Sequence, residues 1–367
     1  MSYVRPERFD GRTAAPVERP PERSSTGATV GLTILVPAYN EAASIADTVR
    51  SLQGQTRPPD EIIVIDDFST DGTGEIARGL GVTVMRPPEN TGSKAGAQMF
   101  ALPLVRTEFC MAIDADTTLA PDAIELIMPA LDDPAVAAAC GFVLPRHVQT
   151  VWERGRYVEY MFAFTFYKRV QDYYERPMIA SGCFSVYRTD VLREVGGWSR
   201  RTMAEDMDLT WTLYQRGHGV RFVPEAVSYP IEPHTYHFVR AQLRRWSHGF
   251  LQNVRLHWRG LLGQPHLRSA VAVGLWDGLV AAVVYLIGLP LLAVLVHPIL
   301  LLGYVIDWPA VAVPVLARAA RRGEVGRALL SLPCFFVLRL VNAAFLLRAA
   351  WAEFVLGRTL TVYEKGH

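Results

Sequence analysis

Short apolar runs alternate with amphipathic segments over the first third of the chain. The apolar runs are rich in β-forming residues and predict strands, whereas the segments between them have the pattern of helices. The predicted strands are Leu32–Pro37, Glu61–Ile65, Val82–Met85 and Phe109–Ile113, and the predicted helices are Glu41–Leu52, Asp71–Leu80 and Ser93–Leu104. This alternation predicts βαβ units and a parallel sheet, with ligands bound beyond the C-terminal ends of the strands.

The last hundred residues are dominated by apolar positions. The stretch from Ser269 to Ala317 is too long for one membrane crossing, so we expect two helices of roughly 20 residues each. A break is expected near Pro290 or at His297-Pro298. A third apolar segment, Leu329–Leu356, contains Arg339 and Arg348. It is expected to cross the bilayer, with the arginines snorkelling or facing protein, although a helix lying in the membrane plane is the alternative.

Two further segments bear on how the chain meets a membrane. Arg318, Arg321, Arg322 and Arg327 form a basic stretch after the second apolar helix, and the positive-inside rule places such a stretch in the cytosol. Residues 155–175 combine many aromatic residues with Arg, Lys and Glu. They are equally consistent with an amphipathic helix on a protein core and with a helix at the membrane interface.

Composition narrows the possible functions. Half of the 367 residues are hydrophobic and the mean hydropathy is +0.15, as expected for a soluble domain joined to membrane helices. The formal net charge of +1 gives no support for a nucleic-acid partner. The four cysteines show no paired spacing and predict neither disulfides nor a zinc site. Residues 1–28 are polar and proline-bearing, without the apolar run of a signal peptide, so a disordered tail and a cytosolic catalytic domain are expected.

Acidic and basic side chains follow several of the predicted strands. Asp66 and Asp67 end the second strand, where a carboxylate can accept hydrogen bonds from a base or ribose. Asp114 and Asp116 follow the fourth strand, and two carboxylates at this spacing can share a divalent cation with a diphosphate. Lys94 opens a helix after a glycine-bearing loop, where an ammonium suits a phosphate, although a solvated surface lysine is the simpler explanation.

Two later segments could also carry chemistry. Glu205 and Asp206 stand where a helix is expected to start, so they could simply cap it. One of them could instead accept the proton of an attacking hydroxyl. The run Gln242-Leu243-Arg244-Arg245-Trp246 combines a cation for a diphosphate with a ring that can stack on a sugar. An interfacial helix anchored by Arg and Trp explains the same residues equally well.

Taken in order, these segments resemble the motif series of the inverting family 2 glycosyltransferases. The resemblance rests on Val36–Glu41, Asp66-Asp67, Lys94–Gly96, Asp114–Asp116, Glu205-Asp206 and Gln242–Trp246, and it covers about residues 32–260. Within the family, the chain is similar to the processive hyaluronan, chitin, cellulose and poly-N-acetylglucosamine synthases. Two departures stand out: Ala204 replaces the usual Thr before the acidic pair, and three membrane segments are few for a polymer channel.

The resemblance implies a role for each matching residue. Ala38, Tyr39, Glu41, Asp66, Asp67, Lys94 and Asp114 would bind the nucleotide sugar. Asp116, with Asp114, would hold Mg²⁺ or Mn²⁺. Asp206, beside Glu205, would be the general base. Gln242, Arg245, Trp246, Gly182 and Cys183 would line the diphosphate and acceptor sites.

The expected architecture is α/β, with a GT-A-type Rossmann-like nucleotide-sugar-binding domain followed by interfacial and then transmembrane helices. The expected regions are a tail (1–28), a cytosolic catalytic domain (29–237), interfacial helices (238–268), a transmembrane region (269–356) and a C-terminal tail (357–367). The expected partners are a UDP-sugar, a glycan or lipid acceptor and the bilayer of the plasma or inner membrane, with a homo-oligomer possible and no nucleic acid. The resemblance implies transfer of an N-acetylglucosamine- or glucose-type sugar to a growing β-linked polysaccharide, with single transfer to a lipid or short oligosaccharide as the alternative.

Overall fold

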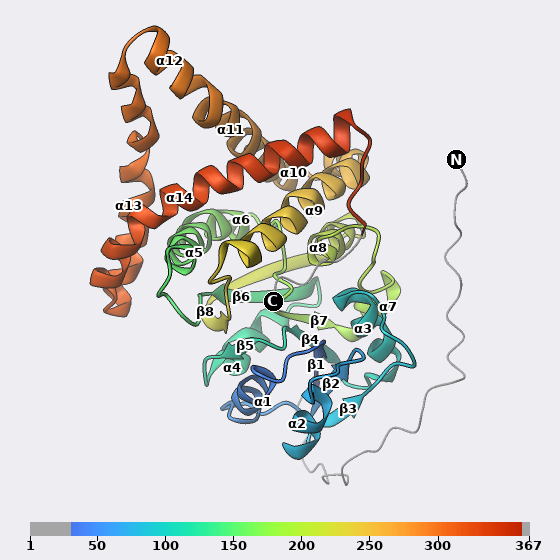
Figure 1. Ribbon diagram of the computed structural model, residues 1–367. Helices are drawn as coiled ribbons and strands as arrows, with labels where there is room; N and C mark the ends of the chain where they lie inside the picture. The colour runs from blue at the N-terminus through green and yellow to red at the C-terminus, as the bar shows by residue number, and fades with distance from the viewer. Residues whose placement is uncertain (1–30, 362–367) are drawn as a thin grey trace.

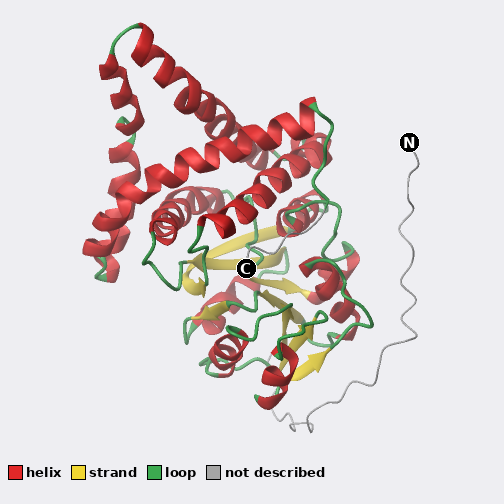
Figure 2. Ribbon diagram, in the orientation of Figure 1, coloured by secondary structure: helices red, strands yellow, loops and turns green. Residues whose placement is uncertain are grey.

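The computed structural model describes residues 31–361, so the expected N-terminal tail and most of the expected C-terminal tail lie outside the described residues. An eight-stranded mixed sheet forms the lower part of the molecule in Figures 1 and 2, in the order β3-β2-β1-β4-β7-β6-β8-β5. The strands are β1 (Leu32–Ala38), β2 (Glu61–Asp66), β3 (Thr83–Met85), β4 (Phe109–Ile113), β5 (Thr117–Leu119), β6 (Val136–Val143), β7 (Phe184–Arg188) and β8 (Gly219–Pro230).

Only one half of the sheet is the predicted parallel one. β3, β2, β1 and β4 pair in parallel, and their nearly continuous apolar runs suit strands that are covered on both faces. β7 then runs antiparallel to β4 and β6, β5 runs antiparallel to β8, and β6 pairs with β8 in parallel. The parallel sheet is therefore confirmed for the four predicted strands, and the further strands make the whole sheet mixed. The later strands were harder to predict because β6, for example, is rich in alanine, which is depleted in strands.

Short helices connect the strands and flank the sheet. They are α1 (Ile45–Gln53), α2 (Thr73–Gly79), α3 (Lys94–Ala101), α4 (Ala123–Ile127), α7 (Thr189–Glu194) and α8 (Glu205–Gln215). The first three lie within or close to the predicted ranges but begin one to four residues later, because capping and turn residues precede each helix. At α3, the side chain of Ser93 accepts a hydrogen bond from the Gly96 N–H and so caps the helix.

A layer of helices separates the sheet from the most apolar part of the chain (Figure 1). It contains α5 (Val151–Phe162), α6 (Lys168–Tyr173) and α9 (Tyr236–Leu262), with a π-helical turn, η3 (Ala163–Tyr167), between α5 and α6. The aromatic segment 155–175 therefore shows features both of a helix packed on the protein core and of a helix at the membrane interface. Tyr157 and Met161 are buried in the core, whereas Phe166 and Tyr173 are exposed.

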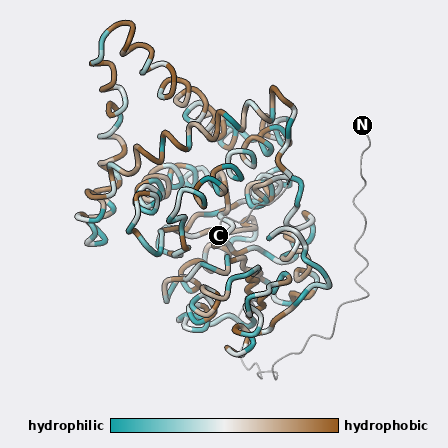
Figure 3. Tube along the Cα trace, in the orientation of Figure 1, coloured by the Kyte–Doolittle hydropathy of each residue, from teal (hydrophilic) through white to brown (hydrophobic). Residues whose placement is uncertain are grey.

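Three segments are long and apolar enough to cross a membrane within the described residues: Pro265–Leu295, Pro298–Arg322 and Val325–Val355. They contain α10 (Pro265–Leu275), α11 (Ala281–Val283), α12 (Leu289–Leu295), α13 (Trp308–Arg322) and α14 (Val325–Ala350), joined in part by short π- and 3₁₀-helical turns. Figure 3 shows hydrophobic colouring concentrated on these helices. The break between the first two segments falls at His297-Pro298, the second of the two predicted places.

The third segment is anchored firmly to the rest of the protein. α14 packs on α5 and α9 through a small core that contains Leu243, Leu338 and Phe345. A Cβ atom at Gly155 of α5 would lie 2.9 Å from the Leu338 Cβ, so this helix contact requires glycine. Arg339 faces protein, because its guanidinium pairs with the Asp307 carboxylate at 2.6 Å.

Candidate active site

A pocket of about 1100 Å³ lies at the C-terminal ends of β1 and β4, beneath α5, α8 and α9. Of the site residues predicted from the sequence, only Asp66 does not line it. The lining includes Ala38, Tyr39, Glu41, Asp67, Lys94, Asp114, Asp116, Gly182, Cys183, Glu205, Asp206, Gln242, Arg245 and Trp246. The sheet topology produces this convergence, because the ends of neighbouring parallel strands meet at one edge of the sheet.

The two acidic residues at the end of β2 lie in different environments. Asp67 borders the pocket, and its carboxylate accepts hydrogen bonds from the Thr91 N–H (2.8 Å) and hydroxyl (2.9 Å). Burial raises the pKa of Asp67, although the bonds from Thr91 oppose this shift. Asp66 is fully buried, and its carboxylate pairs with Arg86 at 2.7 Å. Asp66 therefore supports the loop from beneath.

Lys94 is one of the cations that line the pocket. Its ammonium forms an ion pair with Asp114 and donates a hydrogen bond to the Gly182 carbonyl at 2.7 Å. Burial by itself would lower the pKa of Lys94, but the carboxylates of Asp114 and Glu205 outweigh burial and raise it. Lys94 is therefore a fixed positive charge rather than the solvated surface lysine that was the simpler explanation.

The carboxylates after β4 suit a cation. Among the described residues, no group of three or more His, Cys, Asp or Glu side chains is arranged to hold a metal by itself. Lys94 pairs with Asp114, whereas burial, and then the charges of Asp114 and Glu41, raise the pKa of Asp116 to about 8. Two carboxylates that leave coordination positions to diphosphate oxygens and water fit a hard divalent cation such as Mg²⁺.

Asp206 also lines the pocket, in the first turn of α8. Its two carboxylate oxygens accept hydrogen bonds from the Gly182 N–H and the Met207 N–H, each at 2.8 Å. Glu205 is buried beside it, and burial followed by the charge of Asp206 raises the pKa of Glu205. A Cβ atom at Gly182 would lie 3.0 Å from Asp206 and 3.1 Å from the Lys94 ammonium. Glycine therefore allows the two charged groups to approach one backbone segment.

The motif on α9 is held by a buried arginine that the sequence analysis missed. Arg156 of α5 donates a hydrogen bond to the Gln242 side-chain oxygen at 2.7 Å. Its guanidinium carbon also lies 4.6 Å from the centre of the Trp246 ring, in a cation–π contact. The side chain is only 2% exposed. Arg156 thus fixes the first and last residues of the five-residue motif from below the pocket.

Glu232 is a second group that the sequence analysis missed. It lies in the loop after β8, lines the pocket, and is 4% exposed. The Tyr160 hydroxyl donates to it at 2.8 Å, and Arg156 pairs with it at 3.7 Å. Burial raises the pKa of Glu232, and the positive charge of Arg156 opposes the shift. The only sequence signal for Glu232 as a pocket residue was its position ten residues before Gln242. A single acidic residue in a loop does not by itself predict a functional site.

Comparisons with known proteins agree with this fold. Residues 33–196 match the family described as Glycosyl transferase family 2. The chain is 28% identical over 224 residues to the poly-beta-1,6-N-acetyl-D-glucosamine synthase of Staphylococcus aureus and 27% identical to that of Staphylococcus epidermidis. Each match covers 60% of this chain and 54% of the relative, so the chain spans about half the length of the curated relatives it matches. A mannosyltransferase from Pyrobaculum calidifontis, solved with GDP-Man and Mn²⁺, has the same fold, with a TM-score of 0.58, 21% identity and coverage of 93% and 91% of the two chains.

The fold is therefore the mixed α/β, Rossmann-like GT-A sheet, followed by C-terminal helices of which three are apolar enough to span a membrane. Residues 33–196 form a glycosyl transferase family 2 domain. The resemblance inferred from the motif order is thus confirmed for this part of the chain.

Proposed function

We propose that the protein is a membrane-bound inverting glycosyltransferase that transfers an N-acetylglucosamine- or glucose-type sugar from a UDP-sugar to a growing β-linked polysaccharide. The observation that carries the proposal is the single pocket that brings together Lys94, the Asp114–Asp116 pair and Asp206. The family 2 domain and the similarity to poly-N-acetylglucosamine synthases support the reaction class and the type of sugar.

In the proposed reaction, the acceptor hydroxyl attacks the anomeric carbon of the donor from the side opposite the diphosphate and inverts its configuration. Asp206 accepts the hydroxyl proton as the new glycosidic bond forms. The bond from the anomeric carbon to the diphosphate oxygen breaks, and the nucleoside diphosphate leaves with that electron pair. Lys94 and Arg245 compensate its developing charge, and charges fixed in advance are the largest contribution in many enzymes. Gln242 and Trp246 orient the acceptor.

A divalent cation, Mg²⁺ or Mn²⁺, completes the proposed donor site. Asp116 and Asp114 would hold it, and when bound it would supply positive charge to the diphosphate. The raised pKa of Asp116 supports this assignment, because a nearby cation would stabilise its ionised form. We expect EDTA to abolish turnover and added Mn²⁺ or Mg²⁺ to restore it. Unchanged release of the nucleoside diphosphate in EDTA would contradict metal dependence.

The catalytic domain is proposed to lie on the cytosolic side of the plasma or inner membrane. The basic end of α13 supports this orientation: Arg318, Arg321 and Arg322 are grouped there, and Arg318 donates to the Pro224 carbonyl in β8 at 3.1 Å. The basic end of this span and the catalytic domain therefore lie on the same side. The orientation is tested by placing a cysteine at the C-terminal end of α13 and treating intact cells with a membrane-impermeant labelling reagent. If this end is cytosolic, the cysteine should be protected from labelling.

In the decisive experiment, the purified protein is incubated with Mn²⁺ and, separately, with each of a panel of UDP-sugars and with GDP-mannose. The release of nucleoside diphosphate is measured. We expect a UDP-sugar to be consumed by the wild type and the Asp206→Asn variant to lose at least ~100-fold in turnover, the size of a general-base contribution. Donor binding by this variant should stay within a few-fold of wild type. Wild-type turnover by Asp206→Asn would exclude Asp206 as the base, and exclusive use of GDP-mannose would exclude the UDP assignment.

A specific observation favours transfer of a single sugar to a lipid as the second candidate. The pocket is also lined by Gly274 and Leu346, which belong to the first and third candidate membrane segments. An acceptor could therefore reach Asp206 from the bilayer. Product size separates the two candidates: a ladder of long products supports the polysaccharide, whereas one sugar on an organic-soluble product supports the lipid acceptor.

A further inference from the structure

Four arginines gather where the second candidate membrane segment meets the catalytic domain. We call Arg169 of α6 and Arg318, Arg321 and Arg322 of α13 the arginine cluster. The Arg318 guanidinium lies 5.1 Å from the centre of the Phe142 ring, besides its hydrogen bond to β8. Because α13 ends at Arg322, the cluster lies at the catalytic-domain end of a membrane segment, at the depth where lipid headgroups would be found.

The cluster contains more positive charge than its neighbours neutralise. The charges of Arg169, Arg321 and Arg322 all act on Arg318, and Glu225 opposes them. The buried Nε atom of Arg318 has no hydrogen-bond partner among the described residues. Arg322 pairs with Glu324 at 3.5 Å, whereas neither Arg169 nor Arg321 forms a hydrogen bond or ion pair in the part of the chain that the structure describes. Like charges held together with unused donors favour an anion.

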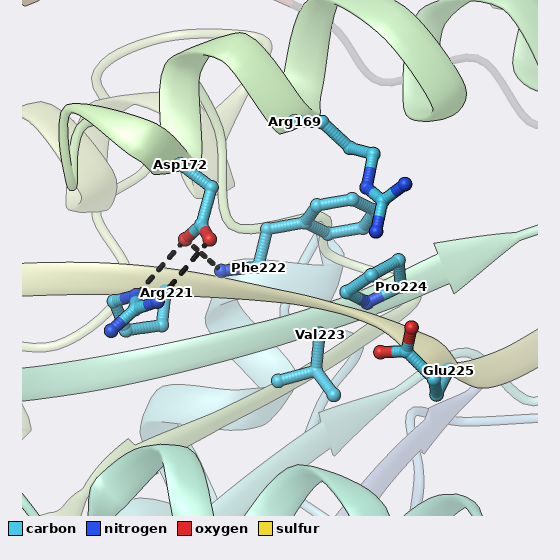
Figure 4. Close-up of a pocket in the computed structure, with 7 residues that line it drawn as sticks. All are labelled: Arg169, Asp172, Arg221, Phe222, Val223, Pro224 and Glu225. Atoms are coloured by element: carbon cyan, nitrogen blue, oxygen red, sulfur yellow. Dashed lines mark hydrogen bonds and ion pairs between the residues drawn. The ribbon is translucent and has the colours of Figure 1, made fainter.

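A pocket of about 350 Å³ lies beside the cluster (Figure 4). The Arg169 side chain extends over its rim toward Pro224, with no interaction to the other residues drawn. Two acidic side chains line the pocket. Asp172 is already paired, because it accepts from Arg221 at 3.0 Å and from the Phe222 N–H at 2.8 Å, and Glu225 adds one negative charge beside Pro224. The free donors of Arg169 are therefore presented to a ligand that enters from the surface.

We propose that the arginine cluster binds the phosphate of an anionic membrane lipid. Guanidinium groups match phosphate oxygens because they donate two parallel hydrogen bonds. Basic pockets beside membrane helices on the cytosolic side have the chemistry that recognises anionic headgroups. A free phosphate ion offers the same oxygens, but the adjacent apolar face of the membrane segment favours a phosphate that carries acyl chains. This site is separate from the catalytic pocket and does not depend on the proposed reaction.

The test uses the full-length protein in detergent and native mass spectrometry. Phosphatidylglycerol and phosphatidylcholine with identical acyl chains are supplied together, and the ratio of the two bound lipids is measured. The wild type should retain phosphatidylglycerol preferentially. The double variant Arg169→Gln/Arg321→Gln should lose this preference by about 25-fold, since each interfacial arginine is worth roughly fivefold. Both side chains are exposed, so the double variant should keep the wild-type melting temperature.

Arg268→Gln is the matched control, because Arg268 is an exposed arginine at the start of the first membrane segment, outside the cluster. It should retain the wild-type preference. An equal loss in Arg268→Gln, or an unchanged preference in the double variant, would overturn the site in favour of general surface attraction. Competition separates the two phosphate sources: a short-chain phosphatidylglycerol should displace the bound lipid. Displacement by inorganic phosphate at the same concentration would overturn the lipid assignment.

Discussion

Replacing Arg156 with Met should expose how the catalytic pocket depends on one buried charge. The change keeps an unbranched side chain of similar length but removes the guanidinium. Glu232, which is 4% exposed, then loses its buried cation, and Gln242 loses a donor. Breaking a buried ion pair by removing one partner costs about 3–5 kcal/mol. For a domain of this size, the loss corresponds to a fall in melting temperature of roughly 6–20 °C.

The loss of stability in the Arg156→Met variant should be smaller at acidic pH than at neutral pH. Burial already raises the pKa of Glu232, and the loss of Arg156 removes the charge that opposes this shift. A carboxyl group whose folded-state pKa exceeds its unfolded value gains stability as the pH falls through that raised pKa. The melting temperatures of the Arg156→Met variant and the wild type should therefore converge at acidic pH. Differential scanning fluorimetry in detergent from pH 5 to 8 measures this.

A double variant separates the charge from the shape of the side chain. Arg156→Met/Glu232→Gln should recover part of the lost stability, since the unpaired carboxylate is gone. Arg154→Met is the control. Arg154 is also on α5, but its guanidinium donates a hydrogen bond to the Gln149 carbonyl at 3.2 Å. It should melt close to wild type. Two results together would refute the reasoning: a melting temperature of Arg156→Met within about 1 °C of wild type, and no further change when Glu232→Gln is added to that variant. The buried network would then contribute nothing to stability.

Two further predictions concern the surroundings of the pocket. Gly182→Ala should reduce turnover of the donor at least ~10-fold, because the added Cβ atom would displace Asp206. Gly79→Ala is the control and should leave turnover unchanged, because a Cβ atom at Gly79 meets no atom within 4 Å. Asp208→Asn should lower the melting temperature at pH 7. Burial opposes ionisation of Asp208, but hydrogen bonds from His257 and Arg201 outweigh it and lower its pKa. That stabilisation is present above about pH 4 and is lost as the pH falls through the lowered pKa, so variant and wild type should converge in thermal melts at acidic pH.

The predictable part of the fold is the part with strong local signals. β1, β2 and β4 are nearly continuous apolar runs, and burial on both faces of the sheet produces this pattern directly. β8 alternates irregularly and contains a bulge opposite β6, so no simple period marks it. The sequence narrowed the break in the first long apolar stretch to Pro290 or His297-Pro298, and in the structure it lies at His297-Pro298. Pro290 lies inside the continuous span Pro265–Leu295, directly after the π-helical turn Val284–Gly288, where the regular α-helical hydrogen bonding is already interrupted.

The sequence alone determined the order of the acidic, basic and aromatic motifs and the three segments that can span a bilayer, because both are properties of neighbouring residues. Tertiary structure decided which members of those motifs face the pocket. Asp66 and Asp67 are adjacent, yet their side chains point in different directions, and one pairs with Arg86 while the other borders the pocket. Arg156 reaches Gln242 across 86 positions of sequence. Such a contact exists only after α5 and α9 have packed, so no local pattern could reveal it.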